Sequence, residues 1–99
     1  MYNYAGRIVE AQAGRDKGKL FYVVGVDPET VRLLLADGKG RKTGRPKAKK
    51  LGHVKCLTDH HREFPHPVTQ KLQRGETVSD RELRRALGAF KEEMRLGKR

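Results

Sequence analysis

Apolar positions in the first half of the chain come in short runs separated by glycine and charge. The runs are rich in β-branched and aromatic residues, which is typical of strands. They predict four strands, over residues 6–12, 20–26, 31–36 and 52–57. Gly14 and Gly18 predict a hairpin loop over residues 13–18, and Asp27-Pro28-Glu29-Thr30 predicts a tight turn. Four short strands with glycine-rich turns in about fifty residues favour a small open barrel.

The pattern changes after Leu57. Residues 59–78 are polar and contain three histidines, so we expect a linker with a short helix over residues 67–73. Ser79-Asp80-Arg81-Glu82 then has the form of a capping box, and it predicts a helix from about Asp80 to Leu96. The apolar positions that follow at helical spacing are Leu83, Ala86, Leu87, Phe90 and Met94. This face either packs on the barrel or docks in the groove of a partner.

These elements divide the chain into three parts. We expect a barrel over residues 1–58 with a basic loop at 38–50, a linker over 59–78, and an amphipathic helix over 79–97. The fold class is therefore mainly β with a C-terminal α element. A chain of 99 residues buries a small core.

Charge points to a polyanionic partner. The chain has 23 Lys and Arg against 12 Asp and Glu, a formal net charge of +11. In a compact domain this basic, the positive side chains repel one another. Binding to nucleic acid or to an anionic membrane would reduce that repulsion. We expect nucleic acid and no membrane, because the excess charge lies in the barrel part and the C-terminal helix lacks a basic membrane-binding face. A merely soluble, basic protein is the alternative.

Two loops carry the candidate binding residues. In the hairpin loop, Arg15, Lys17 and Lys19 flank two glycines that let the backbone turn close to a phosphate. The basic loop has seven cations and no acid between residues 38 and 50, and they are Lys39, Arg41, Lys42, Arg45, Lys47, Lys49 and Lys50. Their mutual repulsion predicts a mobile loop that phosphates would order. The alternatives are a solvated hairpin tip and a flexible solubilising loop.

The same residues carry a resemblance to a known family. Gly6-Arg7-Ile8-Val9, the stretch from Ala13 to Lys19 and the apolar Tyr22-Val23-Val24 resemble the KOW motif of ribosomal and transcription-elongation proteins. The likeness continues through Val31-Arg32-Leu33 and Asp37-Gly38 to the segment ending at Val54. The chain resembles the archaeal and eukaryotic large-subunit ribosomal proteins of the KOW class, particularly the fourteenth, and also short bacterial KOW-domain RNA-binding proteins.

The resemblance implies an SH3-like barrel that binds ribosomal RNA through its loops. It also implies a cytoplasmic protein with RNA, and ribosomal proteins, as partners. A lone cysteine, Cys56, fits a reducing compartment because it cannot form an internal disulfide. A protein-interaction adapter that docks on ribosomes or on transcription machinery is the alternative function.

Nothing in the sequence favours catalysis. Ser79 is the single serine, and its place before a helix predicts a capping role. Cys56 and the histidines His53, His60, His61 and His66 lie near one another in sequence, but their spacing matches no structural zinc pattern. We therefore expect no enzyme activity, no metal, no cofactor and no small-molecule substrate.

Overall fold

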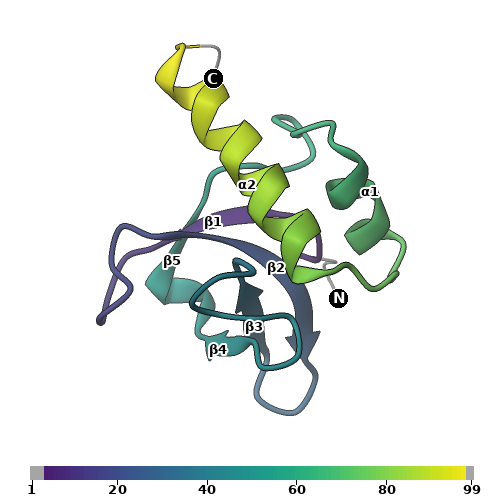
Figure 1. Ribbon diagram of the computed structural model, residues 1–99. Helices are drawn as coiled ribbons and strands as arrows, with labels where there is room; N and C mark the ends of the chain where they lie inside the picture. The colour runs from purple at the N-terminus through teal and green to yellow at the C-terminus, as the bar shows by residue number, and fades with distance from the viewer. Residues whose placement is uncertain (1–3, 98–99) are drawn as a thin grey trace.

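The computed structural model describes residues 4–97, so the first three residues of the expected barrel region lie outside it. Within this range the chain forms one antiparallel sheet and two helices (Figure 1). The elements are β1 (Ile8–Ala11), β2 (Leu20–Asp27), β3 (Arg32–Ala36), β4 (Lys47–Lys49), a 3₁₀ turn (Leu51–His53), β5 (Val54–Cys56), α1 (Pro67–Gln73) and α2 (Asp80–Arg95). The five described strands run in the order β4-β3-β2-β1-β5.

The sheet curls, because the connection between its edges is short. β4 and β5 stand four strand positions apart, about 19 Å in a flat sheet at 4.8 Å per step. Only residues 50–53 join them, and three of these form the 3₁₀ turn. Even fully extended, such a link reaches at most about 18 Å, so a flat sheet is not possible. A register shift between Val23 and Gly25 adds a bulge to β2, which Figure 1 shows as a strongly curved strand.

Alternation along the strands divides the core into two clusters. Ile8, Tyr22 and Ala36 face the helices, whereas their neighbours in sequence face the inside of the curl. The inner cluster is buried and consists of Val9, Ala11, Phe21, Val23, Leu33 and Leu35. Val54 and Cys56 of β5 pack against it, so residues of one edge strand and of β3 share a single core.

Residues 47–49 differ from the sequence expectation. We predicted one basic loop from 38 to 50, but Lys47–Lys49 forms β4 and pairs with β3, with Leu33 opposite Lys49 and Leu35 opposite Lys47. β3 has a free edge there, and its backbone groups need partners. Val31, expected to begin the third strand, instead ends the turn with φ 55°, and its N–H donates to the carbonyl of Asp27 at 2.8 Å.

The expected linker forms part of the core. Phe64, Val68, Leu72 and Val78 are buried in the helix-side cluster, so residues 59–78 are not a spacer between separate units. The short helix α1 has the predicted bounds. Its Thr69 hydroxyl lies 2.9 Å from the Tyr22 hydroxyl, which satisfies both polar groups inside the protein.

The C-terminal helix packs on the sheet. Ser79 and Glu82 form the predicted capping box, and Leu83, Ala86, Leu87 and Phe90 are buried. Met94 is 42% exposed although we placed it on the apolar face, because the last turns of α2 project past the sheet (Figure 1). The four buried positions are thus unavailable to a partner. Neither described helix is long and apolar enough to cross a membrane.

Phe90 is the largest side chain that α2 buries. Its ring is 1% exposed and meets Phe64 edge-on at 5.3 Å. We expect Phe90→Ala to lower the free energy of unfolding by about 3–5 kcal/mol in urea denaturation. Met94→Ala on the same helix should cost less than about 1 kcal/mol, since its side chain is largely solvated. Equal losses would mean that α2 does not pack as described.

Candidate nucleic-acid interface

The hairpin loop (residues 13–18) and the basic segment (residues 38–50, which end in β4 and Lys50) are joined by the carboxylate of Asp16. Lys47 Nζ lies 2.8 Å from Asp16 Oδ2 and Arg41 Nη2 lies 3.4 Å from the same oxygen. Lys19 Nζ is 3.6 Å from Oδ1. The Asp16 side chain is only 10% exposed, because these three cations surround it. One acid of the first loop therefore holds two cations of the second.

Asp16 is ionised at neutral pH. The hydrogen bond from Lys47 lowers its pKa below 3.8, and the charges of Lys47 and Arg41 act in the same direction against the effect of burial. One carboxylate facing three cations leaves the cluster net positive. The pairing thus joins the loops without neutralising the surface.

Lys47 and Lys49 extend from β4 to the hairpin loop, on the side of the sheet that carries the inner cluster. Side chains of paired residues stand on the same face of a sheet, so both lysines lie beside Leu33 and Leu35. A lysine at such a position can pack its aliphatic stem on apolar neighbours while its ammonium group bonds to polar atoms beyond them. Lys49 is 7% exposed, and its Nζ donates to the carbonyl of Ala13 at 2.7 Å. This hydrogen bond from a buried lysine stabilises the backbone of the hairpin loop.

The N-terminal half of α2 supports the basic segment through two hydrogen bonds. Arg84 Nη1 donates to the carbonyl of Gly38 at 2.6 Å, and Asp80 Oδ1 accepts the N–H of Thr43 at 2.8 Å. Asp37 Oδ1 accepts the N–H groups of both Lys39 and Arg41, each at 2.9 Å. These bonds fix a backbone that we expected to be mobile. The sequence suggested only a helix-capping region at Asp80, because the partners of Asp80 and Arg84 are about 40 residues away.

The ten predicted cations fall into three groups. Lys49 is buried, and Arg41 and Lys47 are half-buried around Asp16. The other seven are exposed, and we call them the basic rim: Arg15, Lys17, Lys19, Lys39, Lys42, Arg45 and Lys50. The structure thus brings the two predicted loops together and separates the cations that can meet a partner from those used internally.

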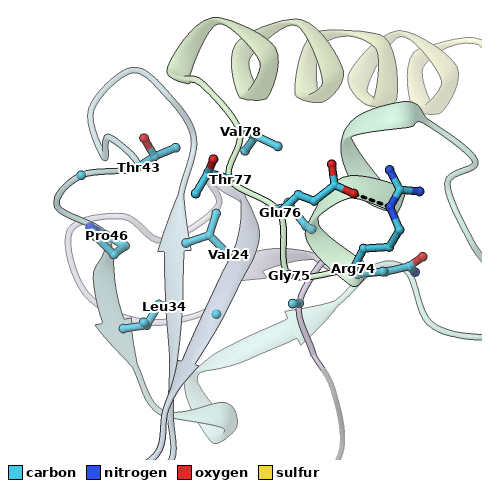
Figure 2. Close-up of a pocket in the computed structure, with 14 residues that line it drawn as sticks. Val24, Leu34, Thr43, Pro46, Arg74, Gly75, Glu76, Thr77 and Val78 are labelled. Atoms are coloured by element: carbon cyan, nitrogen blue, oxygen red, sulfur yellow. Dashed lines mark hydrogen bonds and ion pairs between the residues drawn. The ribbon is translucent and has the colours of Figure 1, made fainter.

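An apolar groove adjoins the basic segment (Figure 2). It has a volume of about 760 Å³ and lies between strands β2 and β3, residues 43–46, and the chain from Leu72 to Val78. Val24, Leu34 and Pro46 line one side. Arg74 and Glu76 form an ion pair at its rim. No local pattern in the sequence predicts this groove, since its walls come from distant parts of the chain.

The histidines contribute no ion pair to the Asp16 cluster, although the backbone N–H of His53 donates to the carbonyl of Lys50 at 2.9 Å. His66 caps α1, its Nδ1 accepting the N–H of Val68 at 3.1 Å, and the rings of His60 and His61 lie against each other. In the part of the chain that the structure describes, no three His, Cys, Asp or Glu side chains gather as metal ligands would. No protein-family model matches the chain, and a search of curated proteins finds no match.

Asp16 gives a pH-dependent prediction. Because its folded pKa is lowered from 3.8, its contribution to stability is complete above that value and is lost as the pH falls through the folded value. We expect Asp16→Asn to lower the free energy of unfolding at pH 7 by about 1 kcal/mol. Its difference from the wild type should shrink progressively below pH 3.8. The control is Glu29→Gln at the exposed β2–β3 turn, and a constant difference for Asp16→Asn down to pH 2 would contradict the pairing.

A second prediction concerns Gly38, where the basic segment contacts the backbone of α2 at Asp80. Its φ is +77°, and a Cβ there would lie 2.1 Å from the backbone oxygen of Asp80. We expect Gly38→Ala to cost at least about 2 kcal/mol in thermal or urea unfolding, from left-handed strain and from displacement of α2. Gly44→Ala in the same segment meets open space and should change stability by less than about 0.5 kcal/mol. A tolerated Gly38→Ala would show that the segment does not rest on the helix.

Proposed function

We propose that the protein binds structured RNA, with the basic rim contacting phosphates. The observation that carries this proposal is the Asp16 cluster, which holds two cation-bearing loops together as one surface. Seven exposed cations lie on the two loops that this cluster joins, and such a group of charges favours a polyanion. Within the described residues, Asp16 is the one acid that forms ion pairs with the cations of these loops, and three cations surround it.

Binding is driven by release of counterions from phosphates. Each Lys or Arg that reaches a phosphate displaces condensed salt ions, and this entropy gain is independent of sequence. Arg15 and Arg45 can each hold a phosphate with two parallel hydrogen bonds, whereas the lysines contribute point charges. The basic segment is already ordered by Asp37, Asp80 and Arg84, so less ordering entropy opposes binding than for a mobile loop.

Recognition of RNA shape fits this surface better than recognition of bases. Phe21, Tyr22, Phe64 and Phe90 are buried and cannot stack on bases. The curled sheet supports a further part of the proposal, that the fold is an SH3-like barrel of the KOW class. With the KOW resemblance, it leads us to propose ribosomal RNA as the target, cytoplasmic location and a binding role without catalysis.

The apolar groove favours a second candidate, a protein-interaction adapter. The apolar face of α2 is buried on the sheet, so an adapter would bind a partner segment in the groove instead. Binding to ribosomal subunits but not to naked ribosomal RNA, insensitive to salt, would favour the adapter. Binding to both, weakened by salt, would favour direct RNA contact.

Salt dependence tests the RNA proposal. If about half of the basic rim touches phosphate, a plot of log K against log salt for a structured RNA should have a slope on the order of −3. Lys42→Gln, Arg45→Gln and Lys50→Gln together should bring that slope about 1 closer to zero and weaken binding to several RNA sequences equally. Exchanging Lys55, Arg62 and Arg85 for Gln gives the same net charge and should have a much smaller effect. A wild-type slope near zero would reject the mechanism.

A further inference from the structure

A hollow separate from the apolar groove lies between the hairpin loop, the basic segment and α2. Its volume is about 430 Å³, within the range of small-ligand sites. Three lysines from three parts of the chain line it, and they are Lys19, Lys39 and Lys91. Lys91 belongs to α2, from which the sequence pattern gave no candidate binding residue. The tertiary structure alone brings it to the basic rim.

The charge of this hollow is unbalanced. Asp37 is the acidic residue that lines it, and its Oδ1 already accepts two backbone N–H groups at 2.9 Å. Lys39 and Lys91 are exposed, and neither forms an ion pair with any residue in the 4–97 range. Lys19 has a long contact of 3.6 Å with Asp16. Three lysines and one acid, whose carboxylate already accepts two hydrogen bonds, line the hollow and give it a net positive charge that favours an anion.

The backbone around the hollow is open. Gly18 and Gly40 both line it, and a Cβ at either position would meet nothing within 4 Å. The N–H of Gly40 has no hydrogen-bond acceptor in the described part of the chain, whereas those of its neighbours Lys39 and Arg41 are bound to Asp37. A phosphate oxygen can therefore approach the main chain here and accept from a free donor.

We propose that this hollow is a phosphate-binding pocket, with Lys91 of α2 as a binding residue opposite Lys19 and Lys39. The pocket rests on the proposed function in that an RNA backbone phosphate is the ligand it would hold. It adds a defined position on the basic rim, where one phosphate is contacted from three elements and not from a single loop. The helix that supports the basic segment thereby also contributes to the binding surface.

The test is the double variant Lys39→Gln/Lys91→Gln, with Lys55→Gln/Arg62→Gln as the charge-matched control. Loss of one phosphate contact should bring the salt slope for a structured RNA about 1 closer to zero and weaken binding on the order of tenfold at low salt. Lys91→Gln alone should weaken binding more than Lys55→Gln alone. Circular dichroism spectra and urea midpoints confirm that each variant is folded.

The outcomes separate the pocket from the proposed function. If the wild type binds RNA and both double variants lose equal affinity, the pocket is rejected while RNA binding stands. If the wild type binds no RNA, the proposed function is rejected, and a titration of labelled protein with inorganic phosphate decides on the pocket. The pocket is supported if phosphate changes the NMR chemical shifts of the backbone amides of Gly18, Lys39 and Gly40 in the wild type and does not change those of Gly18 and Gly40 in the double variant. The pocket is rejected if phosphate leaves these amides of the wild type unchanged.

Discussion

The ion cluster at Asp16 is the interaction on which the arrangement of the charged surface depends. A chain with a net charge of +11 has a general tendency to hold its basic loops apart, yet two of them meet. One nearly buried carboxylate makes this possible by pairing with Lys47 at 2.8 Å and with Arg41 at 3.4 Å. Asp16 pairs with three cations. The cluster therefore holds the two loops together and still has a net positive charge.

The helix α2 provides the second constraint. Its apolar face covers the outer side of the sheet through Leu83, Leu87 and Phe90, which enlarges a core that the sheet alone would leave small. The same helix binds the basic segment through Asp80 and Arg84. Packing and presentation of charge are therefore coupled. A loss of stability at Phe90 or Gly38 would also loosen the surface that we propose for RNA.

Sequence patterns predicted much of the secondary structure, since the signals are local. The capping box at Ser79 and Glu82 and the bounds of α1 depend on residues within one turn of each other. β4 was missed, because Lys47-Ala48-Lys49 has no apolar pattern and forms a strand only where β3 has a free edge. We predicted a linker at residues 59–78 because Phe64 and Val78 are isolated among polar residues. In the structure both side chains are buried in the core under α2.

For the candidate site, the sequence by itself determined which residues carry charge and that they concentrate in two segments. It could not determine which of these cations are free. Lys49 bonds to a carbonyl 36 residues away and Lys47 to a carboxylate 31 residues away, and such pairings have no local signature. The tertiary structure alone decided that Lys91 lines the same hollow as Lys19 and Lys39, because this follows from how α2 packs on the sheet. Charge is a property of composition, whereas its availability depends on long-range distances that only folding sets.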